Sequence, residues 1–212
     1  MKDIIIIGAG GFAREVAWLI EEINEENKEW NLLGFVDDNK EIIGKNLNGY
    51  KVLGNLEYLN KISSDVYIVI AIGNSNVRKA IAKRINNKKY ATLIHPKINI
   101  SKFNEIGEGT IICKDSILTV NISIGKHVII NLDCTIGHDA VLEDYVTVFP
   151  SVNISGQTII RERTELGTNS AIIQGIKIGE NVTLGAGSVV IRDIEDNCIV
   201  VGNPAKKIKD KG

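Results

Sequence analysis

The chain has 212 residues and a formal net charge of −1 from 25 basic and 26 acidic residues. This length allows one large domain or two small ones with a real core. The balanced charge gives no general attraction to nucleic acid or to an anionic membrane. The three cysteines have no metal-type spacing, and no window reaches the ~18 apolar residues of a membrane span. We therefore expect a cytoplasmic protein with reduced thiols, no signal peptide, and no nucleic-acid or membrane partner.

The first ninety residues alternate between strand and helix patterns. The β-branched run at 3–7 is typical of a strand buried on both faces, and apolar residues at helical spacing follow it. Further strands are expected at 32–36 and 66–73, with a second helix around 77–85. This order predicts a small α/β domain over residues 1–92, built as a parallel sheet with helices packed on it.

The loop GAGGFA nearly fits the dinucleotide fingerprint, with Gly8 and Gly10 in the first two places and Ala13 in the third. Glycines let the backbone approach a ligand, and the next helix begins with free N–H groups for an anion. Asp37 and Asp38 follow at the end of the second strand. The motif alone leaves two interpretations open, a nucleotide site or a tight turn beside solvated acids. The domain is about half the length of a two-lobed dinucleotide binder, which argues against NAD.

A six-residue repeat dominates the rest of the chain. From Ile94 to Val190, seventeen consecutive positions six residues apart are Ile, Leu or Val. The residue four places after each of them is small or branched, except Asn104. Hexads of this kind are typical of β-solenoids, in which short strands stack coil upon coil. We therefore predict a β-solenoid with a C-terminal tail over residues 93–212, in which Cys134 packs inward as a small apolar group.

The whole chain resembles one family. GAGGFAREV, FVDDN, AIGNSNVRKAI, LIHP, IGHDAV and VVGNPAK occur in the order and at the spacing found in bacterial hexapeptide-repeat nucleotide-sugar acetyltransferases, the family of the sialic acid O-acetyltransferase and the bacillosamine-pathway N-acetyltransferase. The resemblance implies a Rossmann-like domain followed by a left-handed parallel β-helix with three hexads per coil, assembled as a homotrimer. It also implies acetyl-CoA as cosubstrate, a nucleotide-linked sugar as acceptor, no metal, and a role in surface glycan biosynthesis.

His138 is the third residue of its hexad and is expected to face outward near a corner. At three hexads per coil, Gly156 lies one coil further on, as an exposed backbone position with no side chain in the way. In the family, the matching histidine is the general base, the neighbouring acid (here Asp139) helps to set its tautomer, and the matching glycine offers its amide to the thioester carbonyl. Imidazole suits this chemistry because it ionises near neutral pH, and a developing oxyanion needs a fixed N–H donor. The alternative is a solvated histidine beside a solvated aspartate.

Two further sets of residues follow from the resemblance. Nucleotide-sugar binding is implied for Gly8, Gly10, Gly11, Phe12, Asp37, Asp38 and Asn74, and coenzyme binding for Gly156, Gly167, Thr168, Gly185, Ala186, Pro204 and Lys206. Phe12 and Thr147 stand where some relatives carry histidine, so either His138 works with less local help or the acceptor differs. We expect His95 to be structural at the domain junction and His127 to lie at the surface. The three histidines fall on different faces, so one chain cannot gather them around a metal.

The leading hypothesis is an acetyltransferase that acts on an amino or hydroxyl group of a nucleotide-linked sugar, with His138 as general base. A second hypothesis is a non-catalytic scaffold that binds sugar nucleotides on the same frame, which the two missing histidines support. A third is an NAD-dependent oxidoreductase. The identity of the sugar, of the acceptor atom and of the acyl chain stays open.

Overall fold

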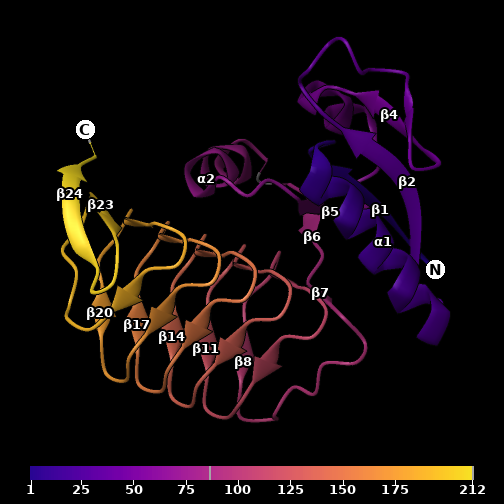
Figure 1. Ribbon diagram of the computed structural model, residues 1–212. Helices are drawn as coiled ribbons and strands as arrows, with labels where there is room; N and C mark the ends of the chain where they lie inside the picture. The colour runs from indigo at the N-terminus through magenta and orange to yellow at the C-terminus, as the bar shows by residue number, and fades with distance from the viewer. Residues whose placement is uncertain (86, 212) are drawn as a thin grey trace.

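The computed structural model describes residues 1–85 and 87–211, and it joins an N-terminal α/β part to a β-solenoid (Figure 1). The N-terminal elements are β1 (Lys2–Ile7), α1 (Gly11–Glu26), β2 (Trp30–Val36), β3 (Asn46–Leu47), β4 (Tyr50–Gly54), the 3-10 helix η1 (Leu56–Lys61), β5 (Tyr67–Ile70), α2 (Ser75–Arg84) and β6 (Lys89–Tyr90). They form one sheet in the order β3-β4-β2-β1-β5-β6, which is parallel except for the β3–β4 hairpin. The small α/β fold is confirmed, whereas β3, β4 and η1 had no sequence prediction.

Strand β1 is buried on both faces of this sheet, as its pattern predicts. Ile4 and Ile6 pack in the cluster that contains α1, while Ile5 and Ile7 pack on the opposite side with α2 and η1 residues. All four side chains are at most 1 % exposed. The strand expected at 66–73 ends at Ile70, because the chain turns there toward α2.

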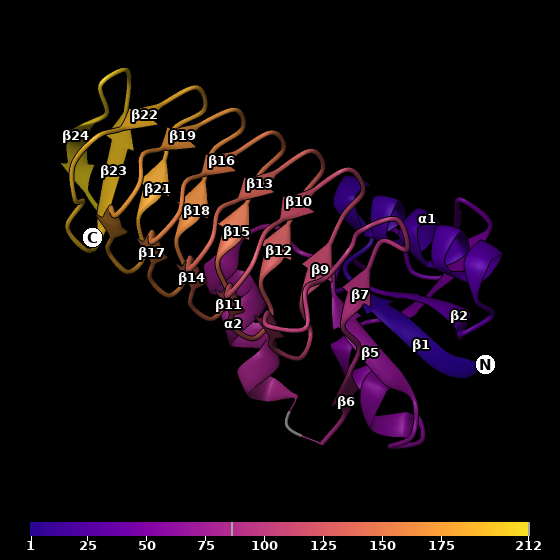
Figure 2. The same ribbon diagram turned by 90° about the horizontal axis from the view of Figure 1, so that it is seen from below.

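The solenoid has three sheets, which we number so that within each coil the chain runs from face 1 to face 2 and then to face 3. Face 1 contains β7 (Leu93–Ile94), β9 (Ile111–Ile112), β12 (Ile129–Ile130), β15 (Thr147–Val148), β18 (Glu165–Leu166), β21 (Thr183–Leu184), β23 (Cys198–Val201) and β24 (Lys206–Asp210). Face 2 contains β10 (Ile117–Leu118), β13 (Thr135–Ile136), β16 (Asn153–Ile154), β19 (Ala171–Ile172) and β22 (Val189–Val190). Face 3 contains β8 (Glu105–Ile106), β11 (Ser123–Ile124), β14 (Val141–Leu142), β17 (Ile159–Ile160) and β20 (Lys177–Ile178). Figure 2 shows faces 1 and 2 as rows of short arrows.

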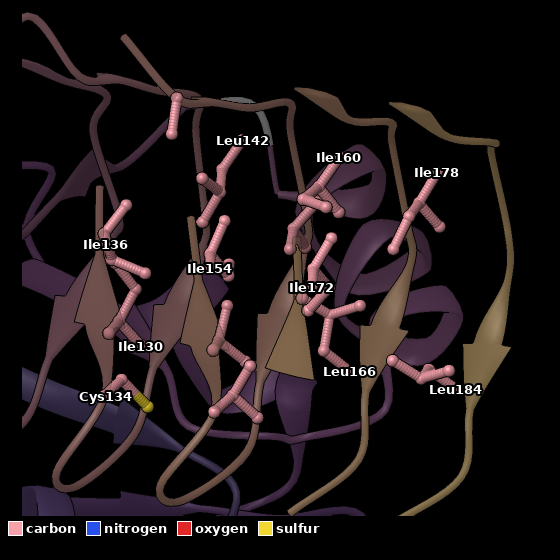
Figure 3. Close-up of a cluster of buried hydrophobic side chains, with 14 of the residues drawn as sticks. Ile130, Cys134, Ile136, Leu142, Ile154, Ile160, Leu166, Ile172, Ile178 and Leu184 are labelled. Carbon is pink, nitrogen blue, oxygen red and sulfur yellow. The ribbon is translucent and has the colours of Figure 1, made fainter. Parts of the chain in front are cut away.

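From β7 to β19, each two-residue strand pairs in parallel with the strand eighteen residues further on, so the three hexads per coil that the family resemblance implies set the register. The first residue of each hexad points inward, and these side chains line up in rows inside the coils (Figure 3). Burying each aliphatic side chain contributes about 1.5–3 kcal/mol. Cys134 is fully buried among them, and burial raises the pKa of its thiol to about 11. The prediction that Cys134 packs inward as a small apolar group is confirmed.

Between the faces the chain turns through three corners, which we call corner 1–2, corner 2–3 and corner 3–1. From Gly109 to Gly187, the fourth residue of every hexad occupies a corner with positive φ, between 54° and 78°. Asn, Asp and Gly tolerate this conformation best. At corner 3–1, however, the bulky residues His127, Tyr145 and Arg163 adopt this positive-φ conformation. Their selection at this corner therefore needs another explanation.

The explanation is that α2 packs against corner 3–1; this helix lies across the coils in Figure 1. Arg78 is fully buried there, and its guanidinium donates to the carbonyls of His127 (2.8 Å) and Tyr145 (2.7 Å) and to Thr147 Oγ1 (2.8 Å). It also donates to the carbonyl of Ile72 (2.7 Å) in the loop after β5. Arg78 is therefore a buried cation that fastens the N-terminal part to the solenoid through many acceptors.

The N-terminus of α2 rests on a carboxylate of face 1. Glu165 accepts hydrogen bonds from the main-chain N–H of Ser75 (2.8 Å) and from its hydroxyl (2.9 Å). A carboxylate at this end of a helix is favourable because the first N–H groups have no partner within the helix. One helix thus connects the loop after β5 to the wall of the solenoid.

Candidate functional site

His138 and Asp139 follow β13 and form corner 2–3. His138 Nδ1 lies 2.7 Å from Asp139 Oδ2, and both side chains are about half exposed. The hydrogen bond with His138, and then one from Asn121, lowers the pKa of the Asp139 carboxyl below its ordinary value. An ionised carboxylate only accepts, so the shared proton belongs on Nδ1 and the lone pair on Nε2.

Gly156 lies directly against the imidazole. A Cβ built on Gly156 would be 2.6 Å from His138 Nε2 and 2.7 Å from Cε1. The carbonyl of His138 also accepts from the N–H of Gln157 at 2.8 Å, which holds the two coils in register. The expected stacking of the pair is therefore present. Gly156 is buried rather than exposed, because the ring itself covers it.

The main-chain N–H of Gly156 takes no part in the hydrogen-bond ladder of the described solenoid. The solenoid ladder leaves the N–H of the third hexad residue unpaired, and carboxylates accept it at three places, in the pairs Lys126–Asp144, Glu162–Glu143 and Glu180–Asp196. Among the described residues, none accepts from the N–H of Gly156. A basic nitrogen and a fixed donor thus adjoin each other, which is the arrangement that acyl transfer requires.

The glycine loop occupies the carboxyl end of β1. Gly8 has φ +102°, and a side chain there would meet the carbonyl of Ala71 at 3.0 Å, so glycine is required. Gly10 precedes α1 and has nothing within 4 Å of a built Cβ. No side chain caps α1, so its first N–H groups have no side-chain acceptor, which suits a phosphate.

The two acids make different contacts within the chain. Asp37 holds the glycine loop, because its Oδ2 accepts from the N–H of Ala9 (2.9 Å) and its Oδ1 from that of Asn39 (2.9 Å). Asp38 binds the N–H of Leu56 (3.0 Å) through one oxygen only. Both acids line a cavity of about 160 Å³ beside Gly8. Asp38 is thus better placed than Asp37 to meet a ligand directly.

The other predicted nucleotide residues are dispersed. Gly11 is exposed at the start of α1, and Phe12 is half-buried against the core of the N-terminal part. Asn74 accepts from the N–H of Val77 (2.9 Å) as the cap of α2, and it lines a second, polar cleft beside β24. Arg14, which sequence reasoning missed, lies near Gly11, with one guanidinium nitrogen 4.0 Å from a Cβ built there. Its position within one turn of the glycine loop is the signal that would have identified it.

Apart from Gly156, the predicted coenzyme residues gather at the C-terminal end of corner 1–2. Gly167 and Thr168 follow β18, and Gly185 and Ala186 follow β21 one coil further on. The carbonyl of Thr168 accepts from the N–H of Gly187 at 2.8 Å. The turn 202–205, which contains Pro204, packs beside β22, and Lys206 begins β24. Within one chain, face 2 separates this set from His138 and Gly156.

The other two histidines are buried. His95 is 1 % exposed, with Nε2 3.3 Å from Glu22 of α1, so it lies at the junction as expected. The surface prediction for His127 is wrong. Its ring stacks on Tyr145 and meets the edge of Tyr90, because β6 and α2 cover this corner. The three histidines occupy three different corners.

Thr147 lies in β15 on face 1, away from the His138 of its own chain. Its hydroxyl donates to the carbonyl of Gly73 (2.8 Å) and accepts from Arg78. Its role within the chain is therefore to fasten the two parts together. In residues 1–85 and 87–211, no group of three or more His, Cys, Asp and Glu side chains could hold a metal ion. No helix in this described part is long and apolar enough to cross a membrane.

Fold and site together define a class: a hexapeptide solenoid acyltransferase that carries an N-terminal α/β domain. Residues 3–85 match the PglD N-terminal domain, and residues 157–192 match the bacterial transferase hexapeptide (six repeats). The chain is 30% identical to GDP-perosamine N-acetyltransferase of Escherichia coli O157:H7, over 96% of this chain and 95% of that protein.

Solved structures agree with this class. The acetyltransferase domain of PglB from Neisseria gonorrhoeae FA1090, solved in a complex with acetyl coenzyme A, has a TM-score of 0.90 and 32% identity over 98% of this chain and 99% of that one. Perosamine N-acetyltransferase from Caulobacter crescentus, in a complex with CoA and GDP-perosamine, has a TM-score of 0.86 and 26% identity over 99% of this chain and 98% of that one. The chain belongs to the bacterial hexapeptide-repeat nucleotide-sugar acetyltransferases and is an acyltransferase.

Proposed function

We propose that the protein transfers the acetyl group of acetyl-CoA to the amino group of a nucleotide-linked amino sugar, with His138 as general base. The observation that carries this proposal is the pair formed by His138 Nε2 and Gly156, with Asp139 behind the ring. The relatives named above support the amino acceptor, since they are N-acetyltransferases, and one solved relative holds a nucleotide-linked sugar. We further propose that the product enters surface glycans and that the reaction takes place in the cytoplasm.

The residues of the site would act in sequence. The sugar amine attacks the thioester carbonyl, and His138 Nε2 takes a proton from the attacking nitrogen. The N–H of Gly156 stabilises the oxyanion of the tetrahedral intermediate. When the intermediate collapses, the C–S bond breaks, and the imidazolium returns the proton to the leaving thiolate. Asp139 keeps the ring in the required tautomer and stabilises the imidazolium.

The N-terminal part would hold the nucleotide. The open space over Gly10, the free start of α1 and the neighbouring Arg14 favour a diphosphate. Asp38, at the cavity beside Gly8, would bind a hydroxyl or a base edge. Asp37 would act indirectly by keeping the glycine loop in shape.

A homotrimer would complete the site. The exposed apolar side chains of the solenoid, apart from Phe103 and Ile208, lie on face 2 or at its bordering corners: Ile117, Val120, Leu132, Ile173 and Ile191. Exposed apolar groups gathered along one face favour self-association. His138 and the coenzyme residues border opposite edges of that face, so a ring of identical chains brings corner 2–3 of one to corner 1–2 of the next.

The test of the chemistry follows release of free thiol from acetyl-CoA with a panel of nucleotide-linked amino sugars. His138→Asn should lower turnover by ~10²–10⁴-fold, while calorimetry should show unchanged binding of acetyl-CoA. Full turnover in this variant with the true acceptor would disprove the mechanism. Failure of the wild type to bind coenzyme A would favour the scaffold hypothesis instead.

The test of the assembly mixes two inactive variants. His138→Asn removes the base, and Ala186→Glu blocks the coenzyme corner with a charge. When the two chains are unfolded, mixed equally and refolded, sites shared between neighbours should regain about one quarter of wild-type activity, because each neighbour is intact in half of the cases. Sites contained within one chain would regain none, and a monomer in sedimentation would contradict the trimer directly.

A further inference from the structure

We propose that Asn121 is a positioning residue: its side-chain amide holds Asp139 in the orientation that leaves His138 Nε2 free toward Gly156. This inference rests on the proposed function, since it concerns the residues assigned there as base and orienting acid. It adds a third side chain to that arrangement, contributed by the preceding coil.

The geometry places Asn121 directly behind the pair. Asn121 and Asp139 are fourth hexad residues in consecutive coils at corner 2–3, with φ 56° and 58°, so their side chains leave the wall in the same direction. Asn121 Nδ2 donates to Asp139 Oδ1 at 3.2 Å. Asp139 Oδ2 is the atom that lies 2.7 Å from His138 Nδ1. Each carboxylate oxygen therefore has one partner, and rotation of the carboxylate would break both contacts.

This fixation matters because Asp139 is exposed. Its side chain is 45% accessible, so water competes for both oxygens and the carboxylate has room to swing away from the ring. A neutral imidazole without that acceptor distributes its proton between the two nitrogens. In the tautomer with the proton on Nε2, the nitrogen that adjoins Gly156 has no lone pair and cannot act as a base.

A similar contact elsewhere in the solenoid provides the matched comparison. At corner 1–2, Ser151 Oγ donates to Asp133 Oδ2 at 3.1 Å, again between fourth hexad residues of consecutive coils. Such a contact is therefore part of the general architecture of these corners. At corner 2–3, its acceptor is the same carboxylate that binds the imidazole, and this gives Asn121 a role beyond the wall of the solenoid.

The experiment reads the tautomer of His138 by NMR of protein labelled with ¹⁵N-histidine. The chain has only three histidines, and His95 and His127 are buried, so the exposed ring is readily assigned through His138→Asn. In the neutral ring of the wild type, Nε2 should resonate as the unprotonated nitrogen. Asn121→Gly, which suits the positive φ, should give a mixture of tautomers and lower kcat about tenfold, with an unchanged KM for acetyl-CoA. Ser151→Gly should leave the His138 resonances as in the wild type.

A second variant protects the test against misfolding. Asn121→Asp keeps the shape and the tolerance for positive φ, but it replaces the N–H donor by an acceptor, so the mixture of tautomers should appear again. An unchanged tautomer in both variants would overturn the proposal and leave Asn121 as a wall residue. An altered tautomer with unchanged kcat would support the positioning contact and contradict His138 as the base. The two proposals can therefore fail separately.

Discussion

The imidazole of His138 fills the space that a side chain on residue 156 would occupy, with Nε2 2.6 Å from the position of a Cβ on Gly156. The backbone of Gly156 does not have the positive φ that favours glycine. Residue 156 must therefore lack a side chain because the ring of His138 occupies that space, and not because of the backbone conformation. A substitution there tests the contact without straining the backbone.

Gly156→Ala should displace the ring and lower kcat by roughly 10²-fold, since a misplaced base loses its alignment with the acceptor. Thermal unfolding should change little, because the ring is exposed and can move. Gly175→Asn is the control: it lies at the same corner with φ +78°, which asparagine tolerates, and it has nothing within 4 Å of a built Cβ. Wild-type activity in Gly156→Ala would refute the contact as a functional one.

Asp139→Asn should lower kcat by about 10²-fold or more, because an amide can donate to Nδ1 and so favours the tautomer with the proton on Nε2. Thiol release measured at saturating acetyl-CoA reports this loss. Asp133→Asn is matched to it: Asp133 is a fourth hexad residue with φ 57° that accepts from the next coil, whereas Asp139 accepts from the preceding coil. Equal losses in the two variants would show that a general weakening of the corners is responsible.

The solenoid could be predicted because its sequence repeat also determines the register in which its strands pair. Counting hexads pointed Cys134 inward, and the three hexads per coil implied by the family resemblance placed Gly156 beside His138. The same counting says nothing of what packs against the outer wall. His127 was assigned to the surface for that reason, although Tyr90 and α2 cover it.

The site was predictable in parts. Local motifs identified the glycine loop and the corner of His138, but they did not show that Asp37 is occupied in holding the loop. Thr147 was interpreted only through relatives, whereas its contacts with Gly73 and Arg78 depend on the docking of α2. Contacts between distant parts of the chain have no periodic signature, so they required the structure.

Arg78→Lys should lower the free energy of unfolding by about 2–4 kcal/mol, because an ammonium group cannot reach the carbonyls and the hydroxyl that the planar guanidinium bridges. Denaturant unfolding measures the loss. Arg84→Lys, at the exposed end of the same helix, should change stability by less than about 0.5 kcal/mol. Similar stabilities for the two variants would contradict the role of Arg78 as the fastening between the two parts.

His127 should make the protein less stable in mild acid. Burial, and then the positive charge of Arg78, lowers the pKa of His127 to about 4, against an ordinary value near 6.5. Between these two values the unfolded chain binds a proton that the folded chain does not, so the free energy of unfolding falls as the pH drops through this window. The full effect is at most about 3 kcal/mol, and it is complete below pH ~4, where both states are protonated.

Melting temperatures should be recorded from pH 7 to pH 4 for the wild type and for His127→Asn. Both proteins carry the same carboxylates, so the difference between their curves reports the contribution of His127. Asparagine tolerates the positive φ at this position and does not titrate, so the variant should start from a lower melting temperature and lose less of it on acidification. Parallel curves for wild type and His127→Asn would mean that the buried ring takes up its proton without opening the junction.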